Sequence, residues 1–184
     1  MLPSIEIYHK TAIKNGLEQA FLAVENSIST TENSHFLNQI DDRWSIAENF
    51  QHLILSGIPI ASALNKSKAI FLVFGFARKP SRSYEQLYSD YKSALKNGAV
   101  ATSRFVPDRD IEYIKKDMLV TWKMIAEKFQ SRLDLWSEAD LDKYRIPHPV
   151  LGKLTFREML FFTIFHNYHH LNRIEELKKI NEKS

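Results

Sequence analysis

Hydrophobic residues recur at intervals of three and four positions along much of the chain, which is the period of one face of an α-helix. This pattern predicts four long amphipathic helices, over residues 7–29, 45–61, 108–133 and 155–181. Ser45 and Thr155 are each followed three positions later by Glu, the arrangement of a capping box at a helix start. Pro59 lies inside the second helix and is expected to kink it, because proline removes a backbone donor.

The segments between the long helices carry the turn-forming residues. Residues 78–83 are expected to form an exposed loop, and residues 84–96 a shorter helix that ends at Asn97 and Gly98. Residues 144–154, which contain two prolines and a glycine, are expected to form a loop or a small hairpin. The predicted fold class is therefore all-α, an antiparallel four-helix bundle with one additional short helix between the second and third long helices.

Composition agrees with a helical domain and restricts its chemistry. With 184 residues, 44% of them hydrophobic, the chain is expected to form a single domain over residues 1–184 and not a disordered segment. Five glycines and six prolines are too few for a hairpin-dense β architecture. The chain has no cysteine, which excludes a disulfide scaffold, a thiolate metal site and a cysteine nucleophile. A metal ion could be held only by histidines or carboxylates.

Charge and hydropathy predict a protein of the cytoplasm that binds neither nucleic acid nor membrane. The 25 Lys and Arg and 22 Asp and Glu are scattered along the helices and do not form one basic stripe. Residues 1–6 lack the basic and apolar stretches of a signal peptide. The longest run without a charged or polar side chain, residues 69–77, is far shorter than the roughly 20 residues of a membrane-spanning helix.

The histidines are the strongest chemical signal. His166 and His170 lie four residues apart on the inward face of the last helix, which places both rings over one point, as in paired metal ligands on one helix. His52 lies in the middle of the second helix and could face the same centre. The alternative for each is a buried imidazole that is hydrogen-bonded to a backbone carbonyl.

The other four histidines give weaker signals. His169 lies about 100° around the helix from His170 and is expected to face an interface or solvent. His148 lies between two prolines and is either a pocket residue or without a role. His9 and His35 are expected on the surface.

Two motifs resemble those of a known family. Residues 44–53, WSIAENFQHL, resemble the Trp-Ser-x-x-Glu-x-x-x-His-Leu signature of the DinB-like superfamily, and residues 166–174, HNYHHLNRI, resemble its terminal His-x-x-x-His stretch. Residues 152–155 resemble the glycine-containing turn that precedes the last helix in that family. The resemblance covers most of the chain and identifies it as a single DinB-like domain.

The resemblance implies a four-helix bundle that holds a divalent metal ion, usually zinc or nickel, with three histidines. By position these are His52, His166 and His170. Many relatives carry a Gly-Gln-Ile-like segment after the final histidine, whereas this chain has Asn172 and Arg173, which indicates a different substrate pocket.

Three imidazoles leave at least one coordination position open, as in a catalytic site. A bound zinc ion lowers the pKa of water to about 7 and also stabilises a thiolate. Similarity to the family therefore suggests a thiol-dependent S-transferase, whose low-molecular-weight thiol would have to arrive as a cosubstrate beside a small-molecule substrate. The alternatives are a metal-dependent hydrolase and a non-catalytic, stress-related metal-binding or ligand-binding protein.

The residues that could assist catalysis are Glu48, Asn49, His148 and Arg173, and each has a plainer interpretation. Glu48 could cap its helix or orient His52, and Arg173 could be a solvated charge. A homodimer is also predicted, because the aromatic residues of the last helix exceed what one inward face can bury; these are Phe161, Phe162, Phe165 and Tyr168. The alternative is that the helix over residues 84–96 covers them.

Overall fold

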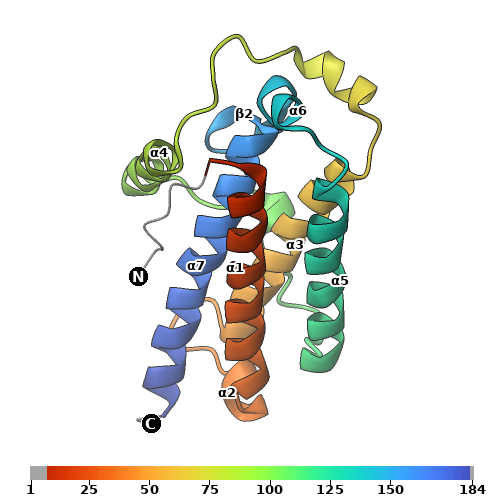
Figure 1. Ribbon diagram of the computed structural model, residues 1–184. Helices are drawn as coiled ribbons and strands as arrows, with labels where there is room; N and C mark the ends of the chain where they lie inside the picture. The colour runs from red at the N-terminus through yellow and green to blue at the C-terminus, as the bar shows by residue number, and fades with distance from the viewer. Residues whose placement is uncertain (1–7, 183–184) are drawn as a thin grey trace.

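The computed structural model of the protein describes residues 8–182 and has four long helices (Figure 1). They are α1 (Lys10–Thr30), α3 (Ile46–Leu64), α5 (Lys115–Leu133) and α7 (Phe156–Asn181). Shorter elements join them: helices α2 (Asn33–Leu37), α4 (Tyr84–Lys96) and α6 (Glu138–Lys143), the 3₁₀ helices η1 (Lys68–Phe74) and η2 (Ser103–Phe105), and strands β1 (Arg145–His148) and β2 (Gly152–Thr155). The predicted all-helical class and the additional helix between the second and third long helices are confirmed. None of the helices within residues 8–182 is long and apolar enough to cross a membrane.

The long helices pack as a bundle in which α1 and α7 run one way and α3 and α5 the other (Figure 1). Because α3 and α5 share a direction, the chain between them must return along the full length of the bundle. Residues 65–114 make that return and carry η1, α4 and η2. Part of this crossover also lines a cavity in the bundle.

The starts of α3 and α7 are the predicted ones. Ser45 and Thr155 each form a complete capping box with the glutamate three residues later. The predicted start of α1 at Ile7 lies outside the described residues. The segment 1–6, predicted not to be a signal peptide, lies outside them too.

The predicted start of α5 near Asp108 is wrong, because α5 begins at Lys115. The Asp108 carboxylate accepts a hydrogen bond from the backbone N–H of Asp110, which closes a turn that competes with a helix. Ile111 and Ile114 are about half exposed, so this end of the predicted apolar stripe does not reach the core.

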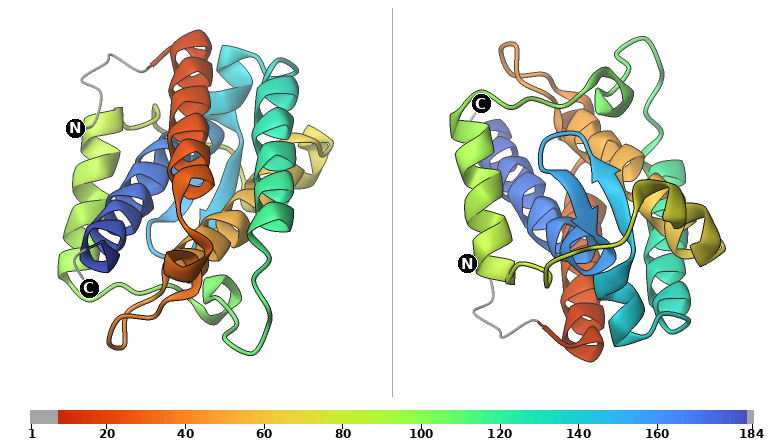
Figure 2. Two further views of the ribbon diagram at one scale, coloured as in Figure 1. Left: turned by 90° about the horizontal axis from the view of Figure 1, so that it is seen from below. Right: turned by 90° about the horizontal axis from the view of Figure 1, so that it is seen from above.

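The segment before α7 is a β-hairpin, one of the two predicted outcomes for residues 144–154. Strands β1 and β2 pair in antiparallel register, with Ile146 opposite Leu154 and His148 opposite Gly152. Gly152 has a φ of +74°, a conformation that glycine adopts without strain. The hairpin lies across one end of the bundle (Figure 2).

Helix α4 lies beside α7 (Figure 2). Tyr84 packs edge-to-face on Phe161, and Tyr91 packs on Phe162 and Phe165. Phe161, Phe162 and Phe165 are all buried within the chain. These aromatic side chains therefore give no support for a dimer. The homodimer stays a prediction that the structure of one chain does not test.

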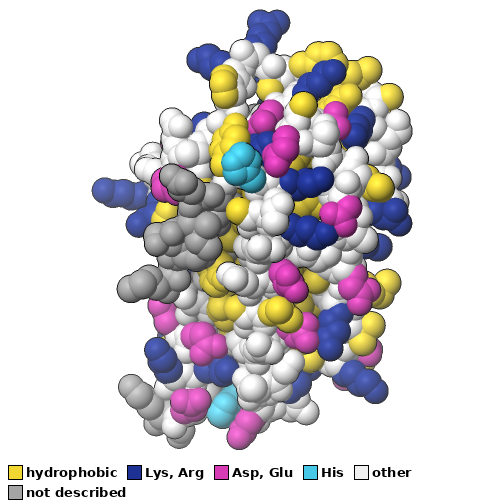
Figure 3. All heavy atoms as spheres, viewed as in Figure 1, with side chains coloured by type: hydrophobic (Ala, Val, Ile, Leu, Met, Phe, Trp, Pro, Cys, Tyr) yellow, Lys and Arg dark blue, Asp and Glu magenta, His cyan; other side chains and the backbone are white. Residues whose placement is uncertain are grey.

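A buried arginine joins α6 to α7. The Arg157 side chain is 1% exposed; it donates to Asp142 Oδ1 at 2.7 Å and to Glu138 Oε2 at 2.8 Å. On the face drawn in Figure 3, by contrast, cationic and anionic side chains are interspersed without a single-sign patch.

Candidate metal centre

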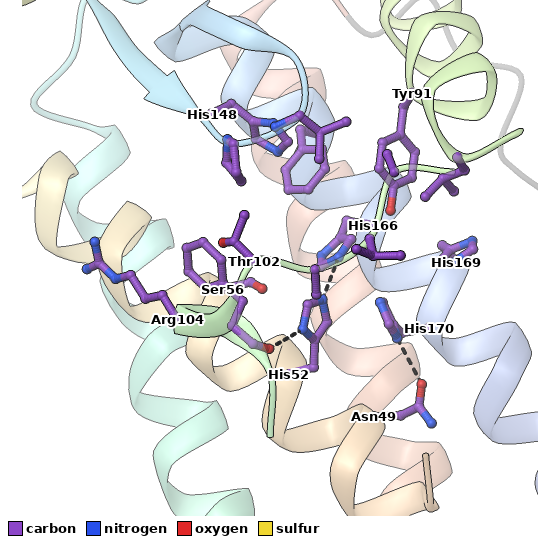
Figure 4. Close-up of a pocket in the computed structure, with 18 of the residues that line it drawn as sticks. Asn49, His52, Ser56, Tyr91, Thr102, Arg104, His148, His166, His169 and His170 are labelled. Atoms are coloured by element: carbon purple, nitrogen blue, oxygen red, sulfur yellow. Dashed lines mark hydrogen bonds between the residues drawn. The ribbon is translucent and has the colours of Figure 1, made fainter. Parts of the chain in front are cut away.

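Three imidazoles converge inside the bundle, His52 from α3 and His166 and His170 from α7 (Figure 4). Each of the three is 5% exposed. One ring nitrogen from each lies within 4.8 Å of the other two, and His52 Nε2 and His166 Nε2 are 3.1 Å apart. The structure thus brings together the three histidines that the sequence singled out.

The hydrogen bond of His52 determines which of its nitrogens faces the centre. His52 Nδ1 lies 2.7 Å from the backbone oxygen of Phe105 in η2. A carbonyl oxygen only accepts, so Nδ1 must carry the proton. In the neutral ring the lone pair is then on Nε2, which points at His166.

His170 is oriented in the same way by Asn49. The Asn49 amide nitrogen donates to the backbone oxygens of Trp44 at 3.1 Å and Ser45 at 2.9 Å. These two bonds identify the amide nitrogen, so the Asn49 Oδ1 must be the atom that lies 2.9 Å from His170 Nδ1. His170 Nδ1 therefore donates, and its Nε2 also keeps a free lone pair.

Burial keeps all three imidazoles neutral near pH 7. It lowers the pKa of His166 and of His170 well below the usual histidine value, and the neighbouring imidazoles add to the effect. Burial also lowers the pKa of His52, partly against its hydrogen bond to Phe105, and the charge of Arg173 lowers it further. Neutral imidazole is the form that binds a metal ion.

The donor set fits a divalent metal ion. Two nitrogens on a tetrahedral zinc ion, each about 2.0–2.1 Å from it, lie about 3.3 Å apart, close to the separation of His52 and His166. Hydrogen bonds from the outer ring nitrogens to a carbonyl and an amide oxygen are the usual support of histidine ligands. His52, His166 and His170 can therefore hold such an ion at one point.

The centre opens on a cavity of about 850 Å³, a size that suits a small-molecule ligand. Its walls come from α3 and the two residues 43–44 before it, α7, the β-hairpin, α4, and residues 99–102 and 104–105 of the crossover. Three guanidinium groups line it, those of Arg43, Arg104 and Arg173.

Glu48, one of the residues considered for catalysis, does not line this cavity. Its carboxylate accepts from the Ser45 backbone N–H at 2.7 Å as part of the capping box. The other carboxylate oxygen accepts from Arg109 Nε at 2.8 Å. Glu48 therefore caps α3 and does not orient His52, which leaves that task to Phe105.

His148 and Arg173 do line the cavity, and so does His169. His169, expected to face an interface or solvent, is half-buried in the cavity wall, where α4 places Tyr91 against it, with ring centroids 6.0 Å apart. Burial lowers the pKa of His169 to about 4. His9 is exposed as expected, whereas His35 is half-buried on α2.

Sequence reasoning missed Tyr91 and Phe105. Tyr91 lies on a helix whose docking on α7 could not be derived from its own pattern. Phe105 acts through a backbone carbonyl, which carries no signal in the sequence.

Comparison with known proteins agrees with this architecture. A family model described as the DinB superfamily matches residues 18–174 of the chain. The chain belongs to the DinB superfamily. This DinB-superfamily chain also resembles the solved structure of YfiT from Bacillus subtilis, which is described as a probable metal-dependent hydrolase with an unusual four-helix bundle topology. The TM-score is 0.56 at 18% identity, over 97% of this chain and 91% of that chain, so the likeness shows a shared fold. No curated protein matches the sequence.

Proposed function

We propose that this DinB-superfamily protein is a divalent-metal-dependent enzyme, with His52, His166 and His170 as ligands and a small-molecule substrate in the adjoining cavity. One observation carries the proposal: two of the three buried imidazoles are held by Nδ1 hydrogen bonds that leave Nε2 free to coordinate. Buried imidazoles that served only packing would not need nitrogens from all three rings to converge on one point.

Metal analysis of the purified protein tests this proposal. We expect one zinc or nickel ion per chain, and its loss from the His166→Ala, His170→Ala double variant, which keeps one ligand of three. His9→Ala is the matched control, because His9 is exposed and remote from the centre. Full metal content in the double variant would refute the ligand assignment.

For the reaction, we favour a thiol-dependent S-transferase. When bound, the metal ion would lower the pKa of a coordinating thiol or water. Among the described residues that line the cavity, three are arginines and one, Glu176, is a carboxylate. Such a wall attracts an anionic cosubstrate and offers few groups to accept a proton from water. Because the chain has no cysteine, a nucleophilic sulfur must come from that cosubstrate.

A metal-dependent hydrolase is the second candidate, supported by the description of YfiT. It would require a proton acceptor near the centre, and Glu176 is the carboxylate in reach of the cavity. A non-catalytic metal-binding or ligand-binding role is the remaining alternative.

Cobalt substitution separates these candidates. A sulfur ligand gives cobalt an intense charge-transfer band in the near ultraviolet, and an oxygen ligand does not. We expect the band on titration with small thiols, together with thiol-dependent turnover of an electrophile. If no thiol gives either signal, the transferase proposal fails; ester or amide hydrolysis would then support the hydrolase, and no turnover the non-catalytic role.

A further inference from the structure

His148 stands at the tip of the β-hairpin and forms part of the cavity wall (Figure 4). The residue is 8% exposed. The ring packs on Phe162 with centroids 4.3 Å apart, and Phe162 in turn stacks on His166 at 4.7 Å. One aromatic ring therefore separates His148 from the three-histidine centre.

The backbone of the hairpin tip fixes the tautomer of His148. Its Nδ1 accepts hydrogen bonds from the backbone N–H groups of Val150, at 3.2 Å, and Leu151, at 3.0 Å. A nitrogen that accepts two such bonds carries a lone pair and not a proton. The remaining ring nitrogen, Nε2, must then carry the hydrogen.

This N–H has no acceptor within the described part of the chain. The Phe162 ring beside it can offer only a weak π contact. Burial lowers the pKa of His148 to about 4, so the ring stays neutral near pH 7 and keeps this single donor. A donor that no protein group satisfies, carried by a largely buried residue in the wall of a ligand-sized cavity, points to an acceptor that arrives with the ligand.

We propose that His148 Nε2–H is a ligand-binding subsite that donates to an acceptor oxygen, the carbonyl or carboxylate oxygen of the molecule bound in the cavity that His148, Phe162 and the three-histidine centre line together. The inference rests on the proposed function in one respect, that the cavity binds a small molecule. The inference adds which chemical group of that molecule faces His148. An amine or another donor group would face the N–H without a hydrogen bond, whereas an oxygen acceptor would satisfy it.

The plainer interpretation is that His148 only caps the hairpin tip. Two substitutions separate the roles, because each retains one half of the imidazole. His148→Asn places a carbonyl oxygen near the position of Nδ1 and can still accept from the tip amides, but it does not reach the cavity. His148→Gln places an amide N–H near the position of Nε2 and keeps the donor without the cap.

The probes are acetophenone, which carries a carbonyl oxygen, and ethylbenzene, which has a similar shape without it. Binding is measured by NMR on the full chain as purified and after metal removal, so that a failure of the metal proposal is distinguishable from a failure of this one. For each variant, the affinity for acetophenone is divided by the affinity for ethylbenzene. A change in the cavity that affects both probes equally then cancels from this ratio.

We expect His148→Asn to lower this ratio about five- to tenfold and His148→Gln to leave it nearly unchanged. In the wild-type protein, nitrogen-15 spectra should show a protonated Nε2 and an unprotonated Nδ1 for His148, with Nε2 shifted by acetophenone and not by ethylbenzene. An unchanged ratio in His148→Asn, a protonated Nδ1, or no binding of either probe would each overturn the proposal. The tautomer measurement needs no variant and holds even if His148→Asn does not fold.

Discussion

Asn49 Oδ1 accepts a hydrogen bond from His170 Nδ1 at 2.9 Å, which links α3 to α7 directly beside the metal centre. Asn49 precedes His52 by three residues on α3, so one turn of helix supplies both a candidate ligand and the group that orients a second candidate ligand. The amide is itself held by the carbonyls of Trp44 and Ser45. The start of α3 thereby sets the geometry of a histidine on another helix.

Replacing Asn49 should weaken metal binding without removing a ligand. We expect Asn49→Leu to lower the affinity about ten- to a hundredfold, because His170 loses the acceptor that selects its tautomer. Asn49→Asp keeps an acceptor oxygen and should retain most of the affinity. Competition with a chromophoric chelator measures both, and unfolding curves check that α3 is intact. Equal losses in the two variants would contradict the orienting role.

The buried ion pair of Arg157 should make stability depend on acid pH. Burial by itself raises the pKa of Asp142, but hydrogen bonds from Arg157 and Ser81 and the charge of Arg157 outweigh it and hold that pKa below the usual value. The stabilisation is therefore complete above the ordinary aspartate pKa of about 3.9 and is lost as the pH falls from there through the lower folded-state pKa.

Asp142→Asn tests this dependence. Near neutral pH the variant should unfold with a free energy about 2 kcal/mol lower than the wild type, because a buried guanidinium loses a charged partner. The difference should shrink at acid pH, where the wild-type carboxylate is itself protonated. Urea unfolding at several pH values measures it. Asp134→Asn, which removes an exposed pair with Lys14, should cause no measurable change.

The arginines of the cavity should discriminate between charged and neutral thiols. We expect the Arg104→Gln, Arg173→Gln double variant of the cobalt protein to bind mercaptoacetate about tenfold more weakly and mercaptoethanol almost as before. The near-ultraviolet band gives both affinities. Arg132→Gln is the control, because Arg132 is exposed on α5 and does not line the cavity. Equal effects on the two thiols would argue against a carboxylate-bearing cosubstrate.

Two glycines with positive φ allow a matched test of the hairpin tip. A side chain at Gly152, with φ +74°, or at Gly98, with φ +86°, would meet no atom within 4 Å, so alanine adds only backbone strain at either position. Each substitution should lower the free energy of unfolding by about 1–2 kcal/mol. Gly152→Ala should in addition weaken acetophenone binding, since it disturbs the turn that holds His148. Gly98→Ala should leave that binding unchanged.

The features predicted correctly from the sequence are those that local chemistry determines. Ser45 and Thr155 mark helix starts because a capping box needs only four consecutive residues. His166 and His170 face inward together because helical spacing alone sets their relation.

The features predicted wrongly or only in part depend on contacts between distant segments. The environment of His169 follows from the docking of α4, and the start of α5 from a turn closed by Asp108. Glu48 and Asn49 are neighbours in one motif, and only the packing of α3 against α7 shows that the amide, and not the carboxylate, contacts a histidine of the candidate metal centre.

The carbonyl of Phe105 ties the tautomer of His52 to the position of the crossover that walls the cavity. A ligand that displaces η2 would take away the acceptor of His52 Nδ1 and thereby change how strongly Nε2 coordinates. By thermodynamic linkage, a bound ion would in turn change the affinity for that ligand by the same factor. The crossover would then couple the two sites, so that the affinity for a ligand in the cavity and the affinity for the metal ion depend on each other.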